Sequence, residues 1–347
     1  MYSFNNDYSE GAHPRILQAL LTANLIQHDG YSTDSQNTAH AKELIQKEIG
    51  QKNADIHWIP GGTQANLITI AAALRPHQAV IAAHTGHINV HETGAIEGTG
   101  HKIIAMPSKD GKVTPAMIRA ALDSHTDEHM VQPKMVYISN TTELGTQYTK
   151  ADLEALYHIC RQKGLYLFLD GARLGAALAS RANDLTLADI AALTDVFYIG
   201  GTKNGALFGE ALIILNPDLK PDFRYMVKQR GAMLAKGWLM GIQFEELFQN
   251  HLFYDMACHA DEMAAILRDG IAECGYSFYS DSVSNQIFPI FPNSVIRRLR
   301  EDFLFSEQAL IDEEHTAVRL VTSWATTEAA VKAFVAILTD ISRNPSS

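Results

Sequence analysis

The stretch LYLFLDGARLGAALASRANDLTLADIAALTDVFYIGGTKNG, residues 165–205, contains two apolar runs that predict buried strands, at residues 165–169 and 196–199. The carboxylate of Asp170 directly follows the first run, and two glycines, Thr202 and Lys203 follow the second. In open α/β sheets, ligands bind outside the carboxyl ends of the strands. We therefore expect Asp170 and Lys203 to face the same ligand, with Asp170 as an anchor and Lys203 as a nucleophile.

The rest of the chain predicts an α/β protein with a second, smaller domain. Strand and helix patterns alternate through residue 200, which indicates a mostly parallel sheet covered by helices on both faces. Beyond residue 240 the pattern changes to a long helix at 242–271, followed by shorter strands and helices. We therefore expect an N-terminal segment at 1–15 that joins the small domain, a large cofactor-binding α/β domain at 16–240 and a small α+β domain at 241–347.

Composition and charge argue against several classes of partner. The chain has 28 Lys and Arg residues against 39 Asp and Glu residues, a net charge of −11, and no basic block. Nucleic-acid binding needs clustered cations, so no nucleic-acid partner is expected. No apolar run approaches the roughly 20 residues that a membrane span requires, and residues 1–14 lack the pattern of a secretory signal. The three cysteines make no Cys-x-x-Cys pair, which indicates a reducing, cytoplasmic setting.

A glycine-rich turn at residues 60–64, Pro-Gly-Gly-Thr-Gln, follows a short predicted strand and begins a predicted helix. Free N–H groups at a helix start bind anions, and glycine lets a phosphate approach the backbone closely. The same residues are typical of an ordinary strand–turn–helix junction in which Thr63 or its neighbour caps the helix. The turn leaves two interpretations open, a phosphate site and a plain helix cap.

Three histidines, His84, His87 and His91, follow the predicted strand at 80–83. On a helix their spacing places them on one face, so zinc binding with Glu92 nearby is one interpretation. The spacing lacks the His-Glu-x-x-His pattern of a zinc site, however, and no metal is expected. A second interpretation is that one ring stacks on a planar cofactor. A third is that these are exposed polar residues, which we favour for His84 and His91.

These features together fit pyridoxal 5'-phosphate. This cofactor needs a lysine amine that bonds to its aldehyde, and an acid that keeps its ring nitrogen protonated so that the ring can accept electrons. It also needs a phosphate pocket and a ring that fixes its orientation. Arg173, three residues after the predicted acid, can hold a substrate carboxylate through two parallel hydrogen bonds. The pattern therefore predicts a pyridoxal-phosphate enzyme that acts on an amino acid.

Five motifs of this chain resemble those of the low-specificity L-threonine aldolases. They are GGTQAN (61–66), the histidine segment HTGHINVHETGA (84–95), DGAR (170–173), TKNG (202–205) and VRLVT (318–322), in that order. Those aldolases belong to the β-eliminating lyase group of fold-type I pyridoxal-phosphate enzymes, and the similarity runs along almost the whole chain. The resemblance implies the fold-type I architecture and a lyase that breaks carbon–carbon bonds.

The resemblance also implies roles for individual residues. Lys203 would hold the cofactor covalently, Asp170 would pair with its ring nitrogen, and His87 would stack on its ring; these three form the implied catalytic set. The implied cofactor-binding set is Gly62, Thr63, Gln64, His87, Asn140, Asp170, Thr202 and Lys203. The implied substrate-binding set is Asn6, Tyr31, Arg173 and Arg319, with both arginines on the substrate carboxylate.

A symmetric assembly is a further implication of the resemblance, as a homodimer or homotetramer with active sites shared between subunits. In such an assembly Tyr31 would act across a subunit interface. One of the cations Lys228, Arg230 and Lys236 would reach a neighbouring phosphate. The sequence alone leaves open which cation does so, and whether the assembly is a dimer or a tetramer.

One motif departs from the family pattern. The family's Glu-Asn-Thr-His appears here as Ser139-Asn140-Thr141-Thr142. The family histidine lies near the substrate's β-hydroxyl, so Thr142 leaves the substrate and its stereochemistry open. The expected reaction is cleavage of the Cα–Cβ bond of a threonine-like β-hydroxy-α-amino acid to glycine and an aldehyde. The alternatives are β-elimination or transamination of another amino acid and, more remotely, a non-catalytic α/β binding protein.

Overall fold

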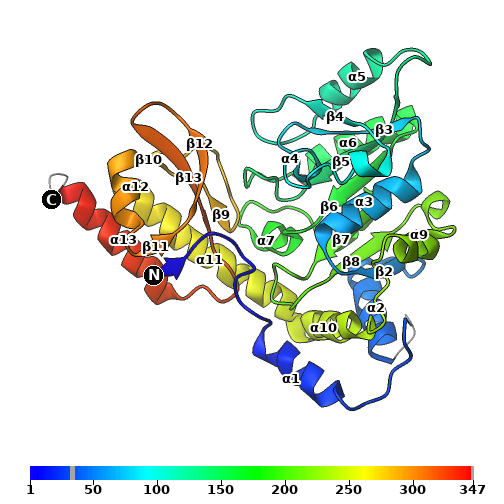
Figure 1. The fold of residues 1–347 in the computed structure, drawn as a ribbon, viewed down its shortest axis with the longest axis horizontal. Helices are drawn as coiled ribbons and strands as arrows, with labels where there is room; N and C mark the ends of the chain where they lie inside the picture. The colour runs from blue at the N-terminus through cyan, green and yellow to red at the C-terminus, as the bar shows by residue number, and fades with distance from the viewer. Residues whose placement is uncertain (32–35, 345–347) are drawn as a thin grey trace.

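Seven strands among the described residues, 1–31 and 36–344, form the central sheet in this computed structural model (Figure 1). Their order is β2-β8-β7-β6-β5-β3-β4, and neighbours are parallel except that β8 is antiparallel to both β2 and β7. The strands are β2 (Asp55–Ile59), β3 (Gln78–Ala83), β4 (Ile103–Met106), β5 (Gln132–Ser139), β6 (Tyr166–Asp170), β7 (Val196–Gly200) and β8 (Glu210–Ile214). The predicted α/β class with a mostly parallel sheet is confirmed.

The strands send alternate side chains into two hydrophobic cores, one on each face of the sheet. In β6, Leu167 and Leu169 belong to one core and Phe168 to the other. Because this alternation places apolar side chains on both faces, both faces need a cover of helices. Helices α3 and α9 supply residues to the core that contains Phe168, whereas α2, α6, α8 and α10 supply residues to the opposite core.

The helices around this sheet are short to medium in length. They are α1 (Pro14–Ala23), α2 (Gln36–Ile49), α3 (Gly62–Ala73), α4 (His87–Val90), α5 (Pro115–Asp123), α6 (Lys150–Lys163), α7 (Leu174–Ala179), α8 (Leu187–Ala192), α9 (Phe223–Gln229) and α10 (Trp238–Phe248), with 3-10 turns at Glu97–Thr99 and Pro217–Leu219. None of the helices in the described ranges combines the length and the apolarity that crossing a membrane requires.

Local sequence signals place β6, which carries the predicted acid. Helix α6 begins with a capping box, because the Thr149 side chain accepts a hydrogen bond from the Asp152 N–H and the Asp152 side chain accepts one from the Thr149 N–H. The helix ends at Gly164, whose φ of 65° is left-handed and favours glycine. The chain then enters β6, and Asp170 at its end pairs with Ser139 at the end of β5. The polar residues that follow these strands therefore meet at one edge of the sheet.

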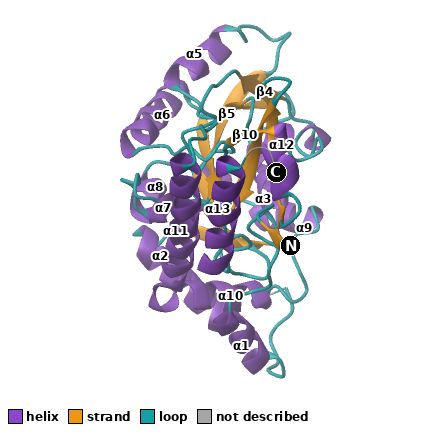
Figure 2. Cartoon of the chain, turned by 90° about the vertical axis from the view of Figure 1, so that its left-hand side faces the viewer, coloured by secondary structure: helices purple, strands orange, loops and turns teal. Residues whose placement is uncertain are grey.

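The remaining chain forms a smaller unit beside the large sheet (Figures 1 and 2). Its helix α13 packs along α11, and β1 at the N-terminus pairs with β11, so residues 2–4 lie against this unit. The division into domains at residues 15 and 240 stays a prediction. The elements are α11 (Leu252–Glu273), α12 (Asn293–Leu299), α13 (Glu328–Arg343), β1 (Tyr2–Ser3), β9 (Gln286–Ile287), β10 (Ile290–Pro292), β11 (Phe303–Leu304), β12 (Ser306–Leu310) and β13 (His315–Val321).

The prediction of one uninterrupted helix at 242–271 is wrong. Helix α10 ends at Phe248, and a 3-10 turn at Gln249–His251 separates it from α11. Asn250 and His251 have φ values of 53° and 61°, a left-handed conformation that a continuous helix does not contain. The apolar periodicity continues across the break, which is why the sequence pattern does not reveal it.

Candidate active site

The carboxyl ends of the central strands border a cavity of about 340 Å³, which we call the inner cavity. Asp170 and Lys203, which the opening stretch of sequence predicts at one site, both line it. The structure therefore brings the predicted acid and the predicted nucleophile to one place. Seven of the predicted site residues line the inner cavity, namely Gly62, Thr63, His87, Asp170, Arg173, Thr202 and Lys203.

Asp170 is surrounded by hydrogen-bond donors. Tyr137 Oη donates to its Oδ2 at 2.5 Å, and Asn66 Nδ2 donates to the same oxygen at 3.0 Å. Tyr198 Oη and a backbone N–H donate to Oδ1. Burial acts to raise the pKa of Asp170, but the neighbouring His87 and the two tyrosine hydroxyls outweigh burial and lower that pKa. The carboxylate is therefore held in its ionised form.

Lys203 follows β7 and lies near a second buried carboxyl group, that of Glu210 on β8. Burial lowers the pKa of Lys203, and the positive charge of Arg173 lowers it further. Burial also raises the pKa of Glu210 to about 8, although the Gly201 N–H and Thr202 Oγ1 donate to it at 3.0 and 2.9 Å. Both shifts favour neutral groups, and a neutral lysine amine is the form that attacks an aldehyde.

Two glycines let the chain segments that carry the acid and the lysine approach each other. A Cβ atom on Gly171 would lie 1.8 Å from the carbonyl oxygen of Tyr198. A Cβ atom on Gly200 would lie 2.4 Å from the carbonyl oxygen of Ala172. Any side chain at either position would push the two segments apart, so the site depends on these glycines for its close packing.

The start of α3 borders the inner cavity without a side-chain cap. Gly61 is the N-cap residue and no side-chain cap is present among the described residues, so the prediction that Thr63 or its neighbour caps the helix is wrong. Gly62 and Thr63 line the cavity, and a Cβ atom on Gly62 would lie 3.0 Å from the Tyr198 hydroxyl. Open N–H groups in a glycine turn suit the phosphate of the predicted cofactor.

His87 begins α4, and its ring joins the hydrogen-bond network around Asp170. Its Nδ1 lies 2.8 Å from Glu92 Oε1, and Asn66 Nδ2 donates to that same carboxylate oxygen at 2.7 Å. Burial acts to lower the pKa of His87, but the hydrogen bond with Glu92 and the charge of Asp170 raise that pKa overall. The ring therefore occupies a fixed position at the cavity wall.

The other two histidines of the motif are exposed, as the sequence predicts. His84 Nδ1 accepts a hydrogen bond from the Ser108 N–H at 3.1 Å. His91 is exposed and lines a second cavity next to the inner one. In the part of the chain that the structure describes, no three His, Cys, Asp or Glu side chains are grouped so that they could hold a metal ion. These residues therefore give no support to the zinc interpretation.

A second cavity of about 550 Å³, the outer cavity, shares five lining residues with the inner one. Arg173 lines both, and its Nε and Nη2 donate to the carboxylate oxygens of Asp7 at 2.7 and 3.0 Å. One edge of the guanidinium is thus occupied, which leaves the N–H groups of Nη1 for a ligand. Arg319 on β13 lines the outer cavity, donates to the Asn5 carbonyl at 3.4 Å, and keeps a buried Nε without a partner among the described residues.

Four predicted residues lie outside both cavities. Asn140 is buried against Tyr148, whose N–H donates to its Oδ1 at 3.3 Å. Asn6 accepts a hydrogen bond from the Tyr8 N–H at 2.9 Å, and it is Tyr8 that lines the cavities. The two others are Gln64, in the first turn of α3, and Tyr31, which is exposed with the Lys228 Nζ 4.2 Å from its ring centroid.

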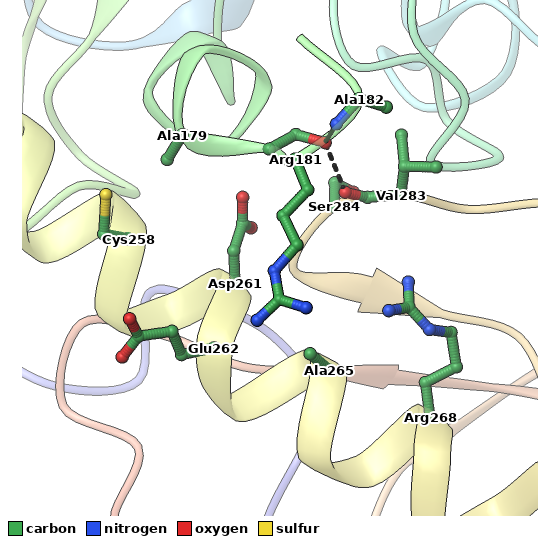
Figure 3. Close-up of a pocket in the computed structure, with 11 residues that line it drawn as sticks. Ala179, Arg181, Ala182, Cys258, Asp261, Glu262, Ala265, Arg268, Val283 and Ser284 are labelled. Atoms are coloured by element: carbon green, nitrogen blue, oxygen red, sulfur yellow. Dashed lines mark hydrogen bonds between the residues drawn. The ribbon is translucent and has the colours of Figure 1, made fainter.

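A separate cavity of about 470 Å³ contains none of the predicted residues. Figure 3 shows Arg181, from the segment after α7, reaching toward α11, which carries Asp261 and Arg268. Both carboxylate oxygens of Asp261 are buried without a hydrogen-bond partner in the described part of the chain, and burial raises its pKa to about 8. No lysine and no helix start line this cavity, so it is not a candidate site for the cofactor.

Comparison with known proteins decides the family. A family model described as beta-eliminating lyase matches residues 9–294. The chain belongs to the beta-eliminating lyase family. It is 31% identical to the low specificity L-threonine aldolase of Pseudomonas aeruginosa over 86% of this chain and 84% of that protein. It is 30% identical to the low specificity L-threonine aldolase of Pseudomonas sp. (strain NCIMB 10558) over 96% of each chain. The family resemblance predicted from the sequence is confirmed.

Solved structures agree with this assignment. The threonine aldolase of Leishmania major is 53% identical to this chain, with a TM-score of 0.97 over 99% of this chain and 100% of that one. The aspartate aminotransferase of Thermus thermophilus is 14% identical, with a TM-score of 0.72 over 98% and 91%, and it shows the fold alone. The fold-type I architecture is therefore confirmed, and the family is one of pyridoxal-phosphate-dependent lyases.

Sequence reasoning missed several polar residues of the site. Asn66 lies within the motif GGTQAN and Glu92 within the histidine motif, so a buried polar partner for Asp170 and His87 could have been sought there. Asp7 and Glu210 carry no local signal, because Asp7 meets Arg173 across 166 residues and Glu210 is the first residue of an apolar strand. Glu143, directly after the Ser139–Thr142 segment, lines both cavities.

Proposed function

We propose that this protein is a pyridoxal-phosphate-dependent lyase that cleaves the Cα–Cβ bond of a threonine-like β-hydroxy-α-amino acid to glycine and an aldehyde. The observation that carries this is the inner cavity, where Lys203 with a lowered pKa and the ionised Asp170 lie beside an uncapped helix start. The relatives named threonine aldolases support the reaction. When bound, the cofactor supplies a ring that accepts the electron pair of the broken bond.

The residues of the inner cavity fit this cofactor. Lys203 would hold its aldehyde carbon covalently, since burial favours the neutral amine. Asp170 would keep its ring nitrogen protonated, because the surrounding donors hold the carboxylate ionised. His87 would stack on the ring, and the N–H groups at Gly62 and Thr63 would bind the phosphate. Gln64 and Asn140 are left out of this set because they line neither cavity.

Two arginines would hold the substrate. Arg173 keeps an unoccupied Nη1 edge, and the buried Nε of Arg319 has no partner among the described residues, so both have donors available for a carboxylate. Asp7 would orient Arg173 and limit its movement. The pair would bind the α-carboxylate at the boundary between the two cavities, which leaves the substrate's side chain in the outer cavity.

We also propose that the protein is a cytoplasmic oligomer whose subunits share their active sites. Tyr31 and Lys228 lie together on the surface and line neither the inner nor the outer cavity, as expected of residues that serve a neighbouring subunit. We therefore retain a homodimer or homotetramer in which Tyr31 and one of Lys228, Arg230 and Lys236 reach the partner's site. The three cysteines are unbridged, which agrees with a reducing compartment.

A substitution at Lys203 tests the function. Lys203→Ala is expected to abolish release of glycine and acetaldehyde from threonine, and borohydride reduction should no longer attach the cofactor to the protein. Lys163→Ala, at an exposed helix end, is the matched control and should behave as wild type. Full turnover by Lys203→Ala, or attachment of the cofactor to another residue, would contradict the assignment.

One observation keeps β-elimination as a second candidate. Thr142 stands where the aldolases of this family have a histidine, and its hydroxyl is engaged by Thr146 Oγ1 at 2.7 Å. A screen of serine, threonine, allo-threonine and aromatic β-hydroxy amino acids separates the two reactions. Glycine and an aldehyde indicate cleavage, whereas ammonia and a keto acid indicate elimination.

A further inference from the structure

Five residues line both the inner and the outer cavity, and only one of the five is a carboxylate. That residue is Glu143. The five are Tyr8, His87, Glu143, Arg173 and Lys203. Because the proposed substrate carboxylate binds at Arg173 and the proposed cofactor at Lys203, the substrate's β-carbon would lie within this shared region. A carboxylate there has a position from which it can accept a proton from the substrate.

Hydrogen bonds fix one oxygen of Glu143 and leave the other available. Oε1 accepts a hydrogen bond from the His87 N–H at 2.9 Å and another from Ser139 Oγ at 2.7 Å. These two donors orient the carboxylate in a single way at the cavity wall. No other residue in the described part of the chain donates a hydrogen bond to Oε2, and the Glu143 side chain lines both cavities.

The neighbouring polar groups are less suited to take a proton. Thr142 Oγ1 lies 2.7 Å from Thr146 Oγ1 and accepts a hydrogen bond from the Leu144 N–H at 3.3 Å, so its hydroxyl is already engaged within the turn at residues 142–146. The Nδ1 of His87 is engaged by Glu92, and that contact helps to raise the pKa of the ring and favours its protonated form. A protonated ring has no lone pair to accept another proton.

We propose that Glu143 Oε2 accepts the proton of the substrate's β-hydroxyl group, an inference that rests on the proposed function. As the O–H bond breaks, its electron pair forms the C=O bond of the aldehyde, and the Cα–Cβ pair is left on Cα, where the bound cofactor would supply the ring that stabilises it. Cα then gains one proton to give glycine, which balances the proton taken up by Glu143. No net oxidation occurs, and solvent exchange restores the carboxylate.

The electrostatics of Glu143 suit this task. Burial raises its pKa, and the negative charge of Asp170 adds to that effect, while the Ser139 hydrogen bond, the Glu143 backbone N–H and His87 oppose it. A base whose pKa is closer to the working pH accepts protons more effectively. Cleavage should therefore fall as the pH drops through the raised pKa of Glu143, because the protonated carboxyl group cannot accept the hydroxyl proton.

Glu143→Gln is the test, because the amide oxygen can still accept both hydrogen bonds that hold Glu143. We expect kcat for threonine cleavage to fall about 10²- to 10⁴-fold, the usual contribution of a general base, with little change in KM. Exchange of the α-proton of glycine with solvent needs no β-hydroxyl, so its rate should stay close to wild type. Glu143→Asp should recover part of the cleavage, and Glu154→Gln, at an exposed helix position, is the matched control.

The outcomes separate this inference from the proposed function. A wild-type protein that releases no glycine and aldehyde would remove the function itself. Wild-type cleavage together with unchanged cleavage in Glu143→Gln would overturn the role of Glu143 alone. Equal losses of cleavage and glycine exchange in Glu143→Gln would also overturn it, because they would indicate a structural defect. Selective loss of cleavage, with loss of the acidic limb of the pH profile, would support it.

Discussion

The regions at the two ends of α7 each contain a buried carboxylate, and the two carboxylates differ in charge. Near the start of the helix, Asp170 accepts hydrogen bonds from two tyrosines, an asparagine and a backbone N–H, and its pKa is lowered. Beyond the end of the helix, neither carboxylate oxygen of Asp261 has a well-aligned hydrogen-bond partner within the described residues, and burial raises its pKa to about 8 although Arg268 and the Asn285 backbone act to lower it. The positive charge of His87 and the hydrogen-bond donors together outweigh burial at Asp170, whereas burial prevails at Asp261.

Two further carboxylates of the active site lie between these extremes. Asp7 faces the fork of Arg173 and accepts a third hydrogen bond from Asn285, so its pKa is lowered despite burial. Glu210 has two donors but, among the described residues, no cation bonded to it, and burial raises its pKa to about 8. The four carboxylates therefore form a series, in the order Asp170, Asp7, Glu210 and Asp261. Along this series, enzyme activity should depend less and less on the negative charge of the side chain.

Neutralising Asp170 should have the largest effect. Loss of one partner of a buried ion pair costs about 3–5 kcal/mol, so Asp170→Asn should lower kcat about 10²- to 10⁴-fold if the carboxylate faces the cofactor's ring nitrogen. Steady-state kinetics on threonine measures this. Asp195→Asn is the matched control, because Asp195 is equally buried and hydrogen-bonded but lies away from both cavities, so it should lower stability and leave kcat unchanged. Equal activities of the two variants would remove the special role of Asp170.

Neutralising Asp7 should affect binding more than turnover. Asp7→Asn keeps the shape of the side chain but weakens its hold on Arg173, whose guanidinium then loses its fixed orientation. A hydrogen bond between charged groups contributes about 1.5–3 kcal/mol, so KM for the amino acid should rise at least about tenfold, with a smaller change in kcat. An unchanged KM, or a loss confined to kcat, would show that Arg173 does not hold the substrate carboxylate.

The strands that carry Asp170 and Lys203 could be predicted because each signal is local. An apolar run that ends in a polar residue identifies a buried strand and its carboxyl end, and Thr149 and Gly164 mark the helix before β6 within a few residues. Parallel strands then bring these ends to the same edge without further information. The family motifs added His87 and the glycine turn.

The donors that set the charges could not be predicted in the same way. Tyr137 and Tyr198 are ordinary members of apolar strands in the sequence, and only the alternation of side chains along β5 and β7 aims both hydroxyls at Asp170. Asp7 reaches Arg173 because β1 pairs with β11, a contact between the chain's first residues and its last hundred. Such contacts depend on the tertiary fold, and no local pattern encodes them.

Glu210→Gln should have a smaller effect, visible only in alkaline solution. Below pH 8 the carboxyl group of Glu210 is mostly neutral, so the amide should change little. Above pH 8 the wild-type carboxylate favours the ammonium form of Lys203, whereas the variant lacks that charge. The pH midpoint for cofactor uptake by the apoprotein should therefore move down, because Lys203 loses a neighbouring negative charge. An upward shift, or none, would contradict the proximity of the two charges.

Asp261→Asn should leave activity at pH 7 unchanged and alter only the pH dependence of stability. The pKa of Asp261 in the folded protein, about 8, lies above its ordinary value of 3.8. The folded state therefore binds the proton more tightly, and the stability contributed by the neutral carboxyl group is lost as the pH rises toward 8. The variant lacks this loss, so its free energy of unfolding relative to wild type should increase between pH 5 and 8, by at most about 1.4 kcal/mol per pH unit.

Denaturant unfolding of the cofactor-loaded protein measures this change in the free energy of unfolding, with Glu262→Gln, at an exposed neighbour on α11, as the control. If the difference in the free energy of unfolding between variant and wild type does not change with pH, Asp261 is ionised in the folded protein, as Asp170 is.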